Sequence, residues 1–209
     1  MLLLGLGKAV TSTTRFTKRV SDLAGGFDGP LALVLGGKTD ALPQLGEGTV
    51  VLVPVNGTEV SRRAAELALT LARPHRATVR ALFVSRGGAD GVGPSLSHRL
   101  EEAVLKEVVD LADRYDVPAE TSISTRDAAG PAITKEAKRG AAMVVMGVTQ
   151  RPGSELLFGE TAMTVLGSCA CPILFLTDER VRLQDAEKEQ RRSGAPVAPD
   201  DTRPQAHSG

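Results

Sequence analysis

Short apolar runs alternate along this chain with longer segments whose apolar residues recur every three or four positions. The runs have the length of β-strands, and the segments between them have the spacing of amphipathic helices. Strands alternating with helices predict an α/β fold, in which helices cover both faces of a parallel sheet. The predicted strands are Leu2–Leu6, Leu31–Leu35, Val50–Val55, Thr78–Val84, residues 121–124, residues 142–146 and residues 172–176.

The first part of the chain is a partial copy of the last part. A shift of 142 residues, without a gap, aligns five residues of structurally demanding types. These matches are Gly5 with Gly147, Ser12 with Ser154, Phe16 with Phe158, Gly25 with Gly167 and Pro30 with Pro172. An in-register repeat indicates two units of one architecture. We therefore expect residues 1–35 to be the C-terminal half of a first domain, so that Met1 begins inside a domain.

The other domain boundaries follow from composition. Residues 36–48 are rich in glycine and proline and predict a linker. Residues 49–177 contain a complete series of strands and helices and predict one full domain. Residues 178–209 are first densely charged and then rich in Pro, Ala, Ser and Asp. They contain too few apolar residues to fold alone, which predicts a largely disordered tail.

Composition excludes several classes of partner. Lys+Arg and Asp+Glu both number 25 and aromatic residues make up only 3% of the chain, which argues against a nucleic-acid partner. No apolar run approaches the length of about 18 residues that a membrane span needs. Two cysteines, Cys169 and Cys171, have no neighbouring histidine and form a poor metal site. We expect them to be small buried thiols in a reducing cytoplasm.

Residues 144–161 contain the strongest sign of a binding site. A buried strand ends at Gly147, a polar loop follows, and a segment with helical spacing contains Phe158, Ala162 and Val165. Free backbone N–H groups and the helix dipole make such a helix N-terminus suitable for an anion. No serine has a histidine and a carboxylate placed by motif, so the chain is predicted to bind a ligand and not to be an enzyme.

Residues 49–176 resemble the universal stress protein (UspA-like) domain family. The features that carry the resemblance are VLVPVNGTE at residues 51–59, ALFV at 81–84, VMG at 145–147, Gly159 and CPILF at 171–175. Residues 150–153 with 157–159 are most similar to the tandem domains at the C-terminus of bacterial cation/proton antiporters. The resemblance implies a five-stranded parallel sheet in the order 3-2-1-4-5, of the adenine-nucleotide alpha-hydrolase-like type, preceded here by a partial β-α-β copy.

The resemblance also implies where a nucleotide would bind. In nucleotide-binding members, adenine and ribose lie at the ends of the first, second and fourth strands, near the point where the strand order reverses. Those places correspond to Val55, Asn56, Val84, Met146 and Gly147. The phosphates lie in the following loop, which here includes Gln150, Arg151, Gly153, Gly159 and Thr161. ATP or another adenine nucleotide is the implied ligand.

This chain departs from the nucleotide-binding pattern of the family. Gln150 stands where the motif has its second glycine, and Glu160 stands where it has a hydroxyl residue. Asn56 replaces the usual aspartate. A carboxylate beside a triphosphate is repulsive by about 1–4 kcal/mol, which Arg151 would partly offset as a phosphate ligand. Two interpretations stay open, a nucleotide-binding loop and a degenerate packing element.

The family resemblance suggests how such domains pair. Last strands commonly pair antiparallel in stress-protein dimers and tandems, and Leu31–Leu35 and Ile173–Leu176 are the equivalent strands here. We therefore expect homodimer or tandem pairing through these strands. The predicted function is a cytoplasmic regulatory or binding module that senses a nucleotide, with a place in the tail of an antiporter. The alternative is a structural dimerisation or assembly module with a non-binding pocket.

Overall fold

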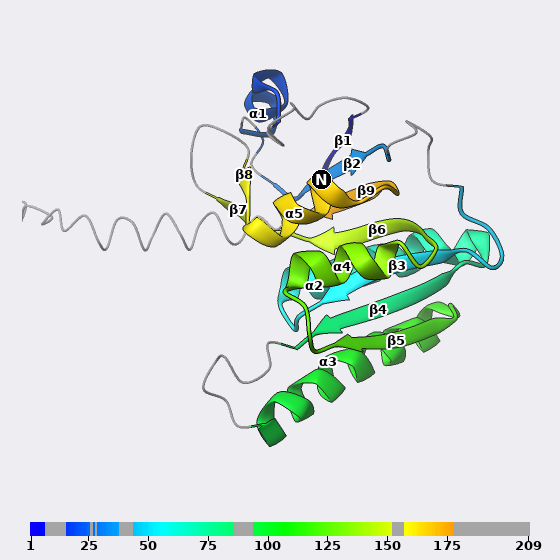
Figure 1. The fold of residues 1–209 in the computed structure, drawn as a ribbon. Helices are drawn as coiled ribbons and strands as arrows, with labels where there is room; N and C mark the ends of the chain where they lie inside the picture. Colours follow the sequence, from blue (N-terminus) through cyan, green and yellow to red (C-terminus); the bar gives the residue numbers. More distant parts are fainter. Residues whose placement is uncertain are drawn as a thin grey trace, which may run out of the picture.

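The computed structural model describes residues 1–6, 16–25, 27, 29–37, 44–85, 94–151 and 157–177. Within them, one sheet of seven strands has the order β1-β2-β9-β6-β3-β4-β5 (Figure 1). The strands are β1 (Leu2–Leu6), β2 (Leu31–Leu35), β3 (Val50–Val55), β4 (Thr78–Val84), β5 (Ala119–Ser124), β6 (Ala141–Gly147) and β9 (Ile173–Leu176). The first four begin and end as predicted, and the others differ by one or two residues.

The strand order confirms the predicted topology and corrects the predicted size of the sheet. Strands β5, β4, β3, β6 and β9 lie side by side in the order 3-2-1-4-5, and all neighbours among them are parallel. The sheet has seven strands and not five, because β2 pairs antiparallel with β9 and β1 pairs parallel with β2. Strand β9 therefore has a hydrogen-bonded neighbour along each edge.

Residues 1–35 join residues 49–177 by hydrogen bonds and by aromatic packing. The Leu31 amide donates to Thr177 Oγ1 at 3.2 Å, and the Thr177 amide donates to the Leu31 carbonyl at 2.8 Å. Phe158 packs edge-on against both Phe16 and Phe175, with ring centroids 5.5 Å apart in each pair. The strands that meet here are the two whose pairing the sequence predicts.

Helices cover both faces of the sheet. Among the described residues they are α1 (Lys18–Gly25), α2 (Glu59–Ala72), α3 (Pro94–Tyr115), α4 (Ala129–Ala137) and α5 (Glu160–Ser168). One core contains Leu69 of α2 and Val108 of α3. The other contains Val20 of α1, Ile133 of α4 and Val165 of α5. Figure 1 shows α4 and α5 on the near face, with α2 and α3 behind the sheet. No helix in the described ranges is both long and apolar enough to cross a membrane.

One local prediction differs from the structure. Phe158 is not part of a helix; it lies in the short strand β8 (Leu157–Phe158), which pairs with β7 (Gln150–Arg151), and α5 starts only at Glu160. Strands of two residues are too short to show the alternation of apolar and polar residues that identifies a strand in a sequence. The predicted tail, residues 178–209, lies outside the described residues.

A group of ion pairs joins β4, β5 and α4. The Arg80 guanidinium contacts Glu120 through Nη2 at 2.7 Å and Glu136 through Nη1 at 3.3 Å. Glu136 also contacts Arg139 at 3.2 Å. The Glu136 side chain is only 10% exposed and that of Arg80 20%, whereas Glu120 and Arg139 are largely in solvent. Glu136 is therefore a mostly buried carboxylate whose less exposed partner is Arg80.

Candidate functional site

The candidate site lies at the carboxyl ends of β6, β3 and β4. These three strands are neighbours in the sheet, although β6 comes after β3, β4 and β5 in the chain. The direction of the connections therefore reverses between β3 and β6. Such a reversal leaves a crevice beyond the strand ends, where ligands of open α/β sheets bind.

An inner cavity of about 150 Å³ occupies this position. Six of the residues predicted for a nucleotide site line it: Val55, Asn56, Val84, Met146, Gly147 and Thr161. Pro54, Ser61, Leu82, Ala129 and Ile133 complete the lining. Most of these side chains are apolar, as is typical of small-molecule pockets.

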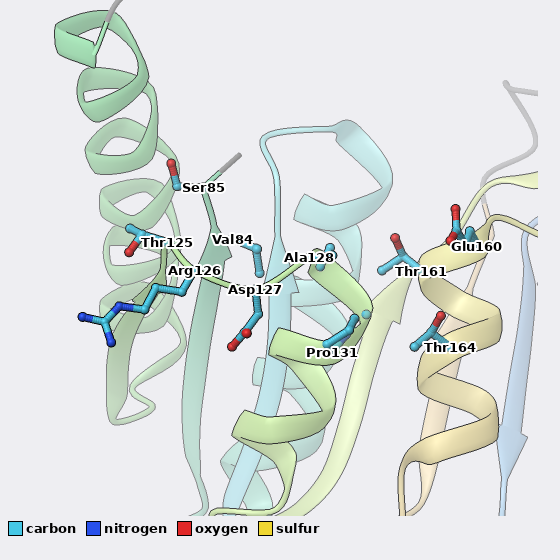
Figure 2. A pocket seen from close by; sticks show the side chains of 12 residues that line it. Val84, Ser85, Thr125, Arg126, Asp127, Ala128, Pro131, Glu160, Thr161 and Thr164 are labelled. Atoms are coloured by element: carbon cyan, nitrogen blue, oxygen red, sulfur yellow. The ribbon is translucent and has the colours of Figure 1, made fainter. Parts of the chain in front are cut away.

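An outer cavity of about 470 Å³ lies beside the inner one and shares Val84, Ala129 and Thr161 with it. Its further lining is Ser85, residues 125–128, Gly130, Pro131, Glu160 and Thr164. Figure 2 shows Thr161 and Thr164 on the side of α5 that faces α4, while Arg126 points away from α5. The polar side of this cavity therefore combines hydroxyl groups, the carboxylates of Asp127 and Glu160, and Arg126 on the side away from α5.

Residues 125–131 form a wall of the outer cavity that no sequence motif predicted. These residues connect β5 to α4, and they reach the cleft because α4 packs closely on α5. A Cβ on Gly130 would lie 2.7 Å from Thr164 Cβ, so glycine permits this approach. Their position directly after a predicted strand was the available signal, because all parallel strands end at the same side of a sheet.

A network of hydrogen bonds fixes Asn56 at the end of β3. Its Oδ1 accepts from the Thr58 amide at 3.2 Å and from Thr58 Oγ1 at 2.7 Å. Thr58 is the N-cap of α2, and its side chain accepts from the Ser61 amide at 3.4 Å. The backbone amide of Asn56 donates to Ser61 Oγ, also at 3.4 Å. Asparagine therefore serves a structural role here, in addition to its place in the cavity wall.

Gly147 is required by packing whether or not a ligand binds. A Cβ at this position would lie 2.4 Å from the Val60 carbonyl oxygen and 2.8 Å from the Ser61 amide nitrogen. Both atoms belong to the first turn of α2, which cannot rotate away as a side chain would. The glycine lets the backbones of β6 and α2 touch directly beside the inner cavity.

The predicted phosphate loop is only partly described by the structure. Gln150 and Arg151 form β7, and their side chains lie outside the described part of the chain, as does Gly153 entirely. Gly159 is the N-cap of α5 and is not among the residues that line the two cavities. Glu160 follows it and is exposed at the rim of the outer cavity. A carboxylate thus occupies the positive end of the helix dipole, where it is favourable.

The comparisons with known proteins support this interpretation of the fold. The Universal stress protein family pattern matches residues 49–176. Universal stress protein MJ0531 of Methanocaldococcus jannaschii is 28% identical over 135 residues, which cover 59% of this chain and 79% of that protein. A universal stress protein of Archaeoglobus fulgidus has a TM-score of 0.53 at 19% identity, covering 61% of this chain and 97% of that one.

Two further structures extend the comparison. The Archaeoglobus fulgidus protein in complex with dAMP has a TM-score of 0.51 at 17% identity and covers 65% of this chain and 99% of its own. A Pseudomonas aeruginosa protein, described as a putative universal stress protein, has a TM-score of 0.56 at 18% identity. It covers 90% of this chain and 67% of its own. The matched part of this chain is therefore longer than residues 49–176. The chain belongs to the universal stress protein family.

Proposed function

We propose that this chain is a regulatory binding module whose cleft takes an adenine nucleoside or a nucleotide with few phosphates. The main support is the inner cavity, which brings together the five residues that the resemblance assigns to adenine and ribose and Thr161, which it assigns to the phosphates. The dAMP complex of the Archaeoglobus fulgidus protein is consistent with such a ligand. The apolar inner cavity would hold the base, and the hydroxyl groups around the outer cavity would bind the ribose.

The charges around the outer cavity set a limit on the ligand. Asp127 and Glu160 both line it, and Asp127 Oδ2 is bonded to Lys135 Nζ at 3.2 Å, which partly neutralises that carboxylate. Glu160 remains at the helix N-terminus, where a phosphate would otherwise bind. The Glu160 carboxylate and a phosphate are both negative and repel each other, so each added phosphate is expected to weaken binding.

Calorimetric titration with adenosine, AMP, ADP and ATP, each with and without magnesium, tests this proposal. We expect saturable binding with affinity falling from adenosine or AMP to ATP. Binding of none of the four at millimolar concentration would reject a nucleotide site. That result would favour the second candidate, an assembly module with a non-binding pocket. The direct packing of Gly147 on α2 explains the glycine at this position without any ligand.

Filling the cleft should abolish binding without unfolding the chain. Ala129 lines both cavities and is the first residue of α4. In an Ala129→Phe variant the ring would occupy ligand space, and we expect at least about tenfold weaker adenosine binding, or about 1.4 kcal/mol. Titration of the folded variant measures this. Ala103→Phe is the matched control, because Ala103 is exposed on α3 and lines neither cavity.

Replacing Glu160 by an uncharged residue should strengthen the binding of ligands that carry phosphates. We expect Glu160→Gln to bind ATP about three- to tenfold more tightly, because Coulomb repulsion at a solvent-exposed site is worth about 1 kcal/mol. Adenosine affinity should not change, since adenosine carries no charge. Glu47→Gln is the control; Glu47 precedes β3 and so lies at the opposite end of the sheet. Equal gains for adenosine and ATP would contradict the electrostatic explanation.

The same module has two proposed contexts. Strand β9 is hydrogen-bonded to β6 along one edge and to β2 along the other, so both of its edges are paired within the chain. This supports tandem pairing over a homodimer formed through β9. The similarity of residues 150–153 with 157–159 to antiporter domains is the sole support for a place in the cytoplasmic tail of a cation/proton antiporter. The comparisons above add nothing to that part of the proposal.

A further inference from the structure

The two cysteines of the chain meet at the turn that connects α5 to β9. Cys169 Sγ lies 3.3 Å from Cys171 Sγ, and the two thiols are free. Cys169 is buried, whereas Cys171 is half-buried and can be reached from solvent. The sequence contains no other cysteine, so no third thiol of the chain competes for either sulfur atom.

The backbone holds both cysteines in place. The Cys169 amide donates to the Val165 carbonyl at 2.8 Å, which anchors it to the end of α5. Pro172, next to Cys171, accepts from the Val144 amide at 2.9 Å, which anchors that side to β6. A Cβ on Gly37 would lie 2.4 Å from the Ala170 carbonyl oxygen, so the backbone after β2 packs closely over the turn. The short sulfur–sulfur distance is therefore built into the fold.

The contact also changes the acidity of the pair. The hydrogen bond from Cys171 lowers the pKa of Cys169 to about 7, and the charge of Lys138 contributes in the same direction. The same hydrogen bond, together with burial, raises the pKa of Cys171. The pair thus releases one proton near neutral pH and keeps the other between the two sulfur atoms. A thiolate is the form that reacts with disulfides.

A metal site is a weaker explanation for the pair. Within the described part of the chain, no three His, Cys, Asp or Glu side chains gather where they could hold a metal ion. Two thiols in contact without further ligands suit oxidation to a disulfide instead, because only a small movement separates contact from a bond. We propose that Cys169 and Cys171 form a reversible dithiol–disulfide site that a low-molecular-weight disulfide oxidises.

The exchange proceeds in two steps. Cys171, the reachable residue, attacks one sulfur of the small disulfide from the minor form of the pair, in which its proton has passed to the Cys169 thiolate. The small disulfide bond breaks, and one thiolate leaves. Cys169 then gives its proton to that thiolate and attacks the Cys171 sulfur, which breaks the mixed disulfide and expels the second thiolate. The second thiolate takes a proton from solvent. Two protein thiols are oxidised to one disulfide, and the small disulfide is reduced to two thiols.

Oxidised glutathione is the probe for this site. The folded protein at low concentration is incubated with it, and free thiols and intact mass are then measured. We expect loss of both free thiols, a mass lower by two hydrogen atoms with no glutathione attached, and full reversal by dithiothreitol. A retained glutathione adduct, disulfide-linked dimers, or two unreacted thiols would each overturn the proposal.

Two comparisons test whether the fold creates the site. Cys169→Ser should retain glutathione on Cys171, while Cys171→Ser should react much more slowly, since Cys169 is buried. The effective concentration of one thiol at the other, measured in glutathione buffers, should be at least about tenfold higher in the folded chain than in urea. An equal or higher value in urea would show that the folded structure does not favour the disulfide.

Discussion

A Gly147→Ala variant is expected to lose about 3 kcal/mol of its free energy of unfolding, near the upper end of what overpacking costs. The added methyl carbon would lie 2.4 Å from the Val60 carbonyl oxygen. That oxygen belongs to the backbone of α2, so relief requires the helix to move away from β6. Moving it would disturb a core that includes Leu69 and Val145, both fully buried.

Urea unfolding of both proteins measures the Gly147 effect. Gly5→Ala is a matched control, because Gly5 is the repeat counterpart of Gly147 and lies in a strand of the same sheet, and a methyl group added to it would have nothing within 4 Å. Its stability should change by less than about 0.5 kcal/mol, as for most surface substitutions. Equal effects of the two substitutions would mean that the α2 backbone yields easily, and the packing argument for Gly147 would fail.

An Arg80→Met variant is expected to be destabilised by about 2–3 kcal/mol, because removing one partner of a buried ion pair leaves the other charge uncompensated. The affected charge is that of Glu136, whose side chain is 10% exposed. Arg139 still contacts Glu136 at 3.2 Å, but it is 70% exposed and compensates only in part. Methionine retains much of the apolar length of arginine, so the loss would come chiefly from charge.

Two further variants test whether the buried charge of Glu136 causes this loss of stability. Lys106→Met removes an ion pair with Asp110 in which the two side chains are 72% and 53% exposed, and it should cost less than about 1 kcal/mol. Adding Glu136→Gln to Arg80→Met removes the orphaned charge and should recover part of the lost stability. If the double variant is less stable than Arg80→Met alone, the buried charge is not the cause.

The strands were the most predictable part of this fold. Leu31–Leu35 and Val50–Val55 were predicted to the residue, because a glycine or proline lies within two residues of each end of these apolar runs, which are buried on both faces. The repeat between residues 1–35 and the end of the chain also indicated which two strands are equivalent, and the family resemblance then predicted that these two strands pair. These features depend on local composition and on self-similarity, both of which a sequence displays directly.

The candidate site was less predictable, because its walls come from the packing of separate elements. Ala129 and Thr164 reach the cleft only through the approach of α4 to α5, and no pattern within either helix reveals that approach. The sequence predicted Gly147 to lie near a ligand. Its contact with the Val60 backbone supplies another reason for glycine, which depends on where α2 lies.

The hydrogen bonds between Leu31 and Thr177 also have a consequence for folding during translation. They connect residues separated by 146 positions, so they form only after nearly the whole of the described chain has been synthesised. Until then the Leu31–Leu35 strand has β1 on one side and an unpaired, apolar edge on the other. Such edges attract other chains. The interval between translation of residue 35 and translation of residue 177 is therefore the period in which a nascent chain most needs protection from aggregation.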